Sequence, residues 1–261
     1  MILVVDVGNT NIVLGVYQQK KLLNHWRIST NKARTVDEYA VTVRNLFDLH
    51  GFGFHNIDGA IISSVVPPVT PALENMIKKY FGVTPIVVGP GIKTGISIVY
   101  ENPREVGADR IVNAVAAINK YGGPLIIVDF GTATTFCAVS EKGEYLGGAI
   151  APGVGISTEA LFQKASKLPR IEIVKTKTVI GKNTVSGMQA GIYHGYCGQI
   201  DRIVQLMKQE LSAKAKAVAT GALAELFLEG TETIDIIDPL LTLEGLLLIY
   251  EKNTIVKDKV T

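Results

Sequence analysis

Residues 1–11, MILVVDVGNTN, and residues 124–135, PLIIVDFGTATT, are near copies of each other. In each copy an apolar run typical of a buried strand ends in Asp-x-Gly, and a turn of small polar residues follows. Asp6 of the first copy and Asp129 of the second lie about half of the 261-residue chain apart. The repeat therefore predicts a chain built from two similar units.

The segments after each copy repeat one order of elements, which is three strands followed by a helix, a strand, a helix and a strand. Expected helices cover 36–51, 70–82, 157–168, a long stretch from about Thr184, 222–230 and 239–253. Expected strands cover 2–8, 59–67, 84–91, 124–131, 215–221 and 233–238, with hairpins at 12–29 and 135–153. We expect an α/β protein with duplicated domains at 1–118 and 119–261, an insertion near 168–183 and a frayed tail from about Thr254.

Composition and charge exclude several classes of partner. Apolar residues make up 47% and charged residues 19% of the chain, as in ordinary globular proteins. The 26 basic and 24 acidic residues are scattered and leave a net charge of +2, so we expect no nucleic-acid partner. No uninterrupted apolar run reaches about 18 residues, so we expect no membrane partner. Met1 leads straight into a strand without a signal peptide, which favours a cytoplasmic location.

The repeated turn has the chemistry of a phosphate site. Gly8 lets the backbone approach a phosphate, and the N–H and hydroxyl groups beside it can donate to phosphate oxygens. Asp6, at the end of its strand, is suited to hold a hydrated Mg²⁺ that bridges those phosphates. A single Asp-x-Gly-Asn sequence is also typical of an ordinary tight turn. Two copies at matching places favour function, because two opposed turns can hold one polyphosphate from both sides.

Other glycine-rich stretches give weaker signals. The chain has neither a Walker A sequence nor GxGxxG before a helix, and GPGIKTG at 89–95 is predicted to be a loop. The turn Thr220-Gly221-Ala222 follows an expected strand and opens an expected helix. Such a turn is a seat for adenine or ribose or, more often, a tight strand–helix joint.

The stretch YENPREVGADR at 100–110 predicts a helix start, with Asn102 as cap and Pro103 in the first turn. Asp109 and Arg110 then lie near the beginning of a strongly helical segment. Two interpretations of Asp109 stay open. It complements the helix N-terminus, or it faces a ligand together with Arg110, because small residues leave room beside them.

A stripe of glycines marks the long helix that begins near Thr184. Its members are Gly187, Gly191, Gly195 and Gly198. Because glycine in a helix interior costs about 1 kcal/mol relative to alanine, the pattern indicates close packing. The partner is either a neighbouring helix of the same chain or a second copy of the chain. A membrane GxxxG contact is excluded because polar residues interrupt the segment.

Taken together, these motifs resemble the superfamily of sugar kinases, Hsp70 and actin. The fold this implies is two duplicated RNase H-like (actin-like ATPase) domains, each a mixed sheet flanked by helices. DVGNTN, GADR with upstream Tyr100, DFGTATT, GGAIAPG and DPLLTLEGL closely resemble the type III pantothenate kinase family, over residues 1 to about 251. The resemblance implies ATP-dependent phosphorylation of pantothenate to 4′-phosphopantothenate, the first step of coenzyme A biosynthesis.

The resemblance also implies roles for individual residues and a homodimer. ATP would contact Asp6, Val7, Gly8, Asn9, Thr10, Asn11, Ile12, Val13 and Thr132, with Asp6 near Mg²⁺. Pantothenate would contact Tyr100, Gly107, Ala108, Asp109, Arg110 and Thr184, with Asp109 as the catalytic base. Asp129 would bind a monovalent cation, K⁺ or NH₄⁺. The chain departs from the family at Ala222, where a glycine is usual and where the added methyl group would narrow the adenine seat.

Two alternative functions remain open on the sequence. A kinase for another small hydroxyl or carboxylate substrate would share both phosphate turns but should lack Tyr100 combined with GADR. A nucleotide-binding transcriptional accessory factor would have no need of Asp109. The presence of Asp109 favours the enzyme.

Overall fold

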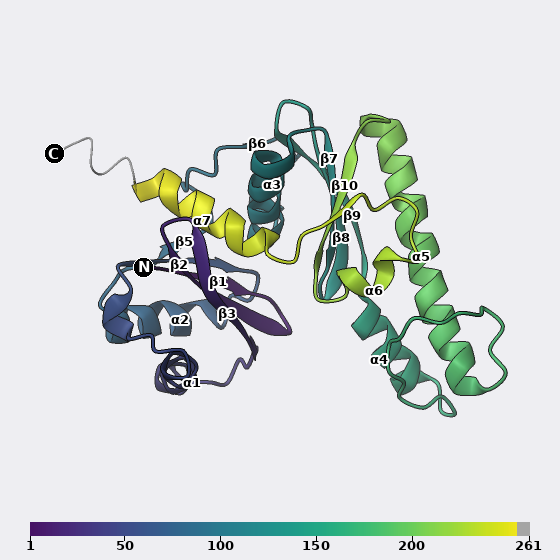
Figure 1. The fold of residues 1–261 in the computed structure, drawn as a ribbon, viewed down its shortest axis with the longest axis horizontal. Coiled ribbons are helices and arrows are strands. Elements are labelled where there is room, and N and C mark those ends of the chain that lie inside the picture. The colour runs from purple at the N-terminus through teal and green to yellow at the C-terminus, as the bar shows by residue number, and fades with distance from the viewer. Residues whose placement is uncertain (255–261) are drawn as a thin grey trace. The chain divides into compact units, whose positions relative to one another are not determined.

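Strand β1 (Ile2–Val7) is the central strand of the first of two sheets in the computed structural model, which describes residues 1–254 (Figure 1). By their internal contacts, the residues form two units. Unit 1 comprises residues 1–95, 101–116 and the segment from Leu241, and unit 2 comprises residues 96–100 and 117–240. The tail that we expect after Thr254 lies outside the described residues.

The helices and strands follow the order predicted for each half. Unit 1 contains β1, β2 (Asn11–Gln18), β3 (Lys21–Ser29), α1 (Val36–Asp48), β4 (Gly59–Ser64), α2 (Thr70–Met76), β5 (Ile86–Val87), most of α3 (Ala108–Tyr121) and α7 (Leu241–Thr254). Unit 2 contains β6 (Ser97–Ile98), β7 (Leu125–Phe130), β8 (Ala133–Val139), β9 (Glu144–Pro152), α4 (Val154–Lys164), α5 (Thr184–Leu211), β10 (Lys216–Gly221), α6 (Ala224–Leu228) and β11 (Ile236–Ile237). The predicted repeat of elements is confirmed.

The two sheets share one topology. Sheet 1 has the order β3-β2-β1-β4-β5, and sheet 2 has the order β9-β8-β7-β10-β11 with β6 added beside β9. In each sheet the first three strands along the chain (β1–β3 and β7–β9) are antiparallel neighbours. The next two (β4 and β5, β10 and β11) run parallel to β1 and to β7, respectively. Short polar turns join the antiparallel strands, whereas the parallel strands follow helical connections. Both faces of the central strand are therefore available to helices.

The two faces of β1 meet different partners within unit 1. Its odd-numbered residues form a buried core with Phe47 of α1 and Leu73 of α2. Val4 points to the opposite face, toward α7, because a Cβ added to Gly15 would lie 3.0 Å from Val4 and 3.2 Å from Leu243. Full burial of such side chains stabilises the fold by about 1.5–3 kcal/mol each. Sheet 1 is thus a layer between α1 and α2 on one side and α7 on the other.

Helix α7 packs on β1 and β4 and belongs to unit 1, whereas the sequence placed it in a domain at 119–261. Two glycines permit this packing. A Cβ on Gly59 would lie 2.7 Å from Cζ of Tyr250, and a Cβ on Gly245 would lie 2.8 Å from Cγ1 of Val112 in α3. The chain therefore returns to the first unit at its end, and unit 1 is discontinuous in sequence.

Helix α3 begins later than the sequence indicated. Asn102 does act as a cap, because its side chain accepts a hydrogen bond from the Arg104 N–H at 3.3 Å, but the element it caps is a single 3-10 turn, Pro103–Glu105. Extended backbone at Val106 ends that turn, and α3 starts at Ala108. Asp109 consequently lies in the first turn of α3.

The predicted insertion at 168–183 contains neither helix nor strand and leads into α5. It is tied to that helix, since Nε2 of Gln189 donates to the Glu172 carbonyl at 3.1 Å. Asn183 and Ser186 form a capping box at the start of α5, as expected near Thr184.

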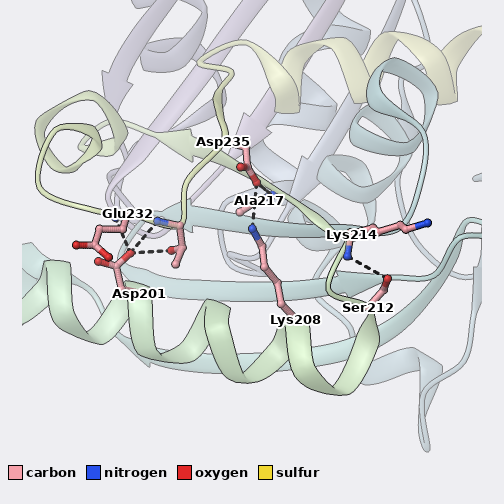
Figure 2. A network of polar contacts seen from close by, with 8 residues as sticks. Asp201, Lys208, Ser212, Lys214, Ala217, Glu232 and Asp235 are labelled. Atoms are coloured by element: carbon pink, nitrogen blue, oxygen red, sulfur yellow. Dashed lines mark hydrogen bonds and ion pairs between the residues drawn. The ribbon is translucent and has the colours of Figure 1, made fainter.

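A polar network attaches β10 and the segment before β11 to α5 (Figure 2). Asp201 of α5 accepts hydrogen bonds from the Glu232 N–H at 2.9 Å, the Thr233 N–H at 3.0 Å and the Thr233 hydroxyl at 2.7 Å. Asp235 accepts from the Ala217 N–H at 2.7 Å and from Lys208 at 3.2 Å.

Among the helices of residues 1–254, none is both long enough and apolar enough to cross a bilayer.

Candidate active site

The first phosphate-type turn lies in unit 1, between β1 and β2. The Gly8 N–H donates to the Asn11 carbonyl at 2.9 Å, and the hydroxyl of Thr30, the residue just after β3, donates to the Gly8 carbonyl at 2.6 Å. Asn9 and Thr10 at the tip are exposed. These hydrogen bonds therefore stabilise the base of the turn, while its exposed tip can be reached by a ligand.

Asp6 is the partly buried residue before the last position of β1. It pairs in register with Val13 of β2 and with Ser63 of β4. Because β1 and β4 are parallel, Asp6 lies where their carboxyl ends meet, which is the edge of an open α/β sheet that usually binds ligands.

The second turn, in unit 2, has the same construction but is one residue shorter. The Gly131 N–H donates to the Ala133 carbonyl at 3.1 Å, which leaves Thr132 alone at the tip. Asp129 pairs with Thr135 of β8 and with Thr220 of β10. The two turns are thus structural counterparts.

The turn after β10 lies close to Asp129. Gly221 has φ +94°, and a Cβ there would lie 2.8 Å from Oδ1 of Asp129, so the position favours glycine on both counts. Ala222, the departure from the usual glycine, is exposed in the turn before α6.

The GGAIAPG segment brings a helix N-terminus to the second turn. Gly153 is the N-cap of α4, and its N–H donates to the Thr132 carbonyl at 3.1 Å. A Cβ on Gly153 would also lie 2.6 Å from the Gly131 carbonyl oxygen. This motif entered the sequence analysis only through the resemblance, and the contact supplies its physical role.

Asp109 is the titratable group in the GADR segment. Its Oδ1 accepts a hydrogen bond from the Arg110 N–H at 2.8 Å, and the carboxylate lies against Gly107, where a Cβ would be 2.5 Å from Oδ1. Burial raises the pKa of Asp109 above its usual value of 3.8, whereas the Arg110 N–H and the Arg110 charge oppose this rise. The result is a carboxylate that binds a proton more readily than an ordinary surface aspartate.

Tyr100 and Thr184, both predicted to bind substrate, lie in unit 2. The Tyr100 ring is 37% exposed and lies over Gly147 of β9, where a Cβ would be 3.1 Å from Cε2. The short strand β6 holds it there, because the Val99 N–H donates to the Tyr145 carbonyl at 2.8 Å. Thr184 is the first residue of α5 and is exposed.

The glycine stripe of α5 is exposed along its length. A Cβ added at Gly187, Gly191, Gly195 or Gly198 would meet no atom within 4 Å among the residues that the structure describes, the helix's own nearby backbone aside. The alternative in which a neighbouring helix of this chain packs on the stripe is therefore wrong for residues 1–254. A second copy of the chain is the alternative that remains.

The predicted site residues divide between the two units. Unit 1 holds residues 6–13 and 107–110, and unit 2 holds Tyr100, Asp129, Thr132 and Thr184. Within residues 1–254, no three His, Cys, Asp or Glu side chains are grouped as a metal site. Single carboxylates fit Mg²⁺ nonetheless, because that ion commonly takes one or two protein carboxylates and completes its shell with water and phosphate oxygens.

Sequence reasoning missed the residues that support the turns, which are Thr30, Ser63 and Gly153. Their signals are weak, since Thr30 and Gly153 are small residues at the ends of predicted hairpins and Ser63 is a small residue within a predicted strand. Only strand pairing and turn contacts show that they lie beside Gly8, Asp6 and Thr132.

Comparison with known proteins accords with this architecture. Residues 2–206 match the family model described as type III pantothenate kinase. A type III pantothenate kinase from Halalkalibacterium halodurans is 62% identical over 253 residues, covering 97% of this chain and 100% of the relative.

Two solved structures show the fold. One is described as a Baf family transcriptional activator from Campylobacter jejuni, with a TM-score of 0.60, 20% identity and coverage of 96% of this chain and 98% of that one. The other is a ROK hexokinase from Thermus thermophilus, with a TM-score of 0.50, 16% identity and coverage of 97% and 99%. The fold is the expected pair of RNase H-like domains of the actin-like ATPase type. The duplicated turns, the GADR segment and these similarities lead to one conclusion: the chain belongs to the type III pantothenate kinase family.

Proposed function

We propose that this chain transfers the γ-phosphoryl group of ATP to the primary hydroxyl of pantothenate, which yields 4′-phosphopantothenate and begins coenzyme A biosynthesis. The observation that carries the proposal is the GADR segment in a member of this family: Asp109 is partly buried, has a raised pKa and is held between Gly107 and Arg110. A protein that only bound nucleotide would gain nothing from such a group.

Asp109 acts as the catalytic base in this proposal. Phosphoryl transfer passes through a loose transition state, so the acceptor hydroxyl needs orientation first and loses its proton late. An aspartate with an ordinary pKa is a weak base at neutral pH, and the raised pKa of Asp109 improves the match. In this proposal Arg110 pairs with an anionic group of the acceptor or of the phosphate.

The two turns bind the phosphates of ATP. Residues 6–13 contribute the first turn, and Thr132 contributes the tip of the second. Asp6 holds hydrated Mg²⁺, and Asp129 holds K⁺ or NH₄⁺; these cations neutralise the charge on the phosphates. The matching construction of the two turns supports a shared role in holding phosphates.

The enzyme acts as a homodimer through α5. The exposed glycine stripe presents a surface that a second helix can approach closely, and Val185 beside it is 43% exposed. Thr184 begins the same helix, so pantothenate binds near the subunit boundary. We place the reaction in the cytoplasm, and Cys137 and Cys197, both buried thiols outside any disulfide, accord with a reducing compartment.

The proposal is tested by coupled ADP release from purified protein with Mg·ATP and pantothenate, in K⁺ and in Na⁺ buffer. We expect turnover with pantothenate in K⁺ and none with hexoses. Turnover with another small alcohol or acid but not with pantothenate would favour the related-kinase alternative. ATP binding without transfer to any acceptor would favour the accessory-factor alternative, for which the similarity to the C. jejuni protein shows only a common fold.

A further inference from the structure

Ser63 carries a buried hydroxyl that the proposed function does not use. It is the fifth residue of β4 and is 0% exposed. Its Oγ finds no hydrogen-bond partner among residues 1–254. A buried hydroxyl without a partner costs about 1–3 kcal/mol, so an alanine of nearly the same size would be the more stable choice if the residue served only packing.

The position of Ser63 places its hydroxyl beside Asp6. The two residues are paired in register on the parallel strands β1 and β4, so their side chains leave the same face of sheet 1. That face is opposite to the α1–α2 core, because Val5, Val7 and Ile62 belong to that core whereas Asp6 and Ser63 do not. Strands in a sheet lie about 4.8 Å apart, within reach of a hydrogen bond after a rotation about χ1.

The second unit repeats this arrangement. Thr220 of β10 is paired in register with Asp129 of β7, as Ser63 is with Asp6, and it is 2% exposed. In both units a buried hydroxyl residue therefore stands on the parallel strand next to the aspartate that ends the central strand. Packing alone does not require a hydroxyl twice at this one position.

We propose that Ser63 is a positioning residue for the metal carboxylate: its Oγ donates a hydrogen bond to the Asp6 carboxylate when Asp6 holds hydrated Mg²⁺. This rests on the proposed metal role of Asp6. Carboxylates that hold metals are usually fixed by such outer hydrogen bonds, and loss of one lowers metal affinity about 10- to 100-fold. The hydroxyl is then partnered in the metal-bound enzyme, which accounts for its retention in a buried place.

The test measures Mn²⁺ affinity by electron paramagnetic resonance, with a non-hydrolysable ATP analogue present, together with thermal unfolding of the metal-free protein. Ser63→Ala should weaken Mn²⁺ binding about 10-fold while the melting temperature stays equal or rises. Ser64→Ala is the matched control on the other face of β4. Its hydroxyl accepts from the Thr70 hydroxyl at 2.7 Å and from the Val66 N–H at 3.1 Å, so its loss should lower the melting temperature and leave Mn²⁺ affinity unchanged.

Two further variants separate this inference from the role of Asp6. Asp6→Asn should weaken Mn²⁺ binding, and adding Ser63→Ala to Asp6→Asn should weaken it no further, because the hydroxyl acts through the carboxylate. Wild-type affinity in Ser63→Ala together with weakened affinity in Asp6→Asn would overturn the inference alone. Wild-type affinity in Asp6→Asn would overturn the metal role of Asp6 and the inference with it.

Discussion

Replacing Gly107 by alanine should disable Asp109 without unfolding the protein. The backbone φ of Gly107 is outside the left-handed region, so alanine is allowed there, but its Cβ would lie 2.5 Å from Oδ1 of Asp109. Ordinary contact begins at 3.4 Å, so the carboxylate has to retreat by about 0.9 Å. The clashing atom is the end of a side chain, which can move at little cost to stability.

This displacement of the carboxylate should slow catalysis strongly. A misplacement of about 1 Å at a reacting group costs about 100-fold in rate, so kcat for pantothenate should fall about 100-fold in Gly107→Ala while the KM for ATP changes little. The assay is steady-state ADP release, with thermal unfolding measured in parallel.

Gly155→Ala is the matched control for Gly107→Ala. Apart from the helix's own backbone, no atom of the described residues lies within 4 Å of its added Cβ, and it sits in the first turn of α4, so it should keep wild-type kcat and gain slightly in stability. A Gly107→Ala enzyme with kcat within threefold of wild type would refute the idea that Gly107 positions the carboxylate. Unfolding of Gly107→Ala at assay temperature would refute the assumption that the carboxylate yields.

Four other outcomes are expected. Asp109→Asn should lose turnover, and at pH 7.5 it should melt at the same or a higher temperature than wild type. Because folding raises the pKa of Asp109, the wild-type protein loses stability as pH rises from the unfolded through the folded pKa of this group, so the difference in melting temperature should vanish below pH 3.8. A lower melting temperature of Asp109→Asn at pH 7.5 would contradict this. In wild type the acid limb of kcat should lie above pH 3.8, as a pH–rate profile would show. Gly59→Ala should lower the free energy of unfolding by about 1–3 kcal/mol, because the added methyl group overlaps with Tyr250. In denaturant melts, adding Tyr250→Phe to Gly59→Ala should restore part of this loss. If the losses of the two single variants simply add in the double variant, the contact is not the cause. Finally, activity should vanish in Na⁺ buffer and return with K⁺ or NH₄⁺, and equal rates in all three would remove the cation role of Asp129.

Much of the fold was predictable because its elements are locally encoded. The apolar runs that end at Val7 and Phe130 form β1 and β7, and the turns after them close hairpins as their small residues indicate. Asn183 marks the start of α5 through its own capping box. The even-numbered and odd-numbered faces of β1 likewise follow from alternation along the strand.

The site was predictable in part. The residue types and their order in GADR and in the two turns are visible in sequence, and the resemblance assigned their roles. The raised pKa of Asp109 was not visible, because it depends on burial of the carboxylate in the folded protein. The neighbours Ser63 and Thr220 were equally hidden, since the register that sets them beside Asp6 and Asp129 forms between strands distant in sequence.

The sequence by itself determined the duplication, the position of most strands and helices and the family, because periodicity, turn residues and motifs act over a few neighbouring residues. Only the tertiary structure decided where distant segments went. Strand β6 joined the sheet of unit 2, and α7 joined unit 1, where Gly15, Gly59 and Gly245 leave room for it. Helix α7 is apolar around much of its circumference, so its sequence pattern does not indicate which surface of the protein it packs against. Its packing partner is determined by steric fit between the helix and surfaces that other parts of the chain form.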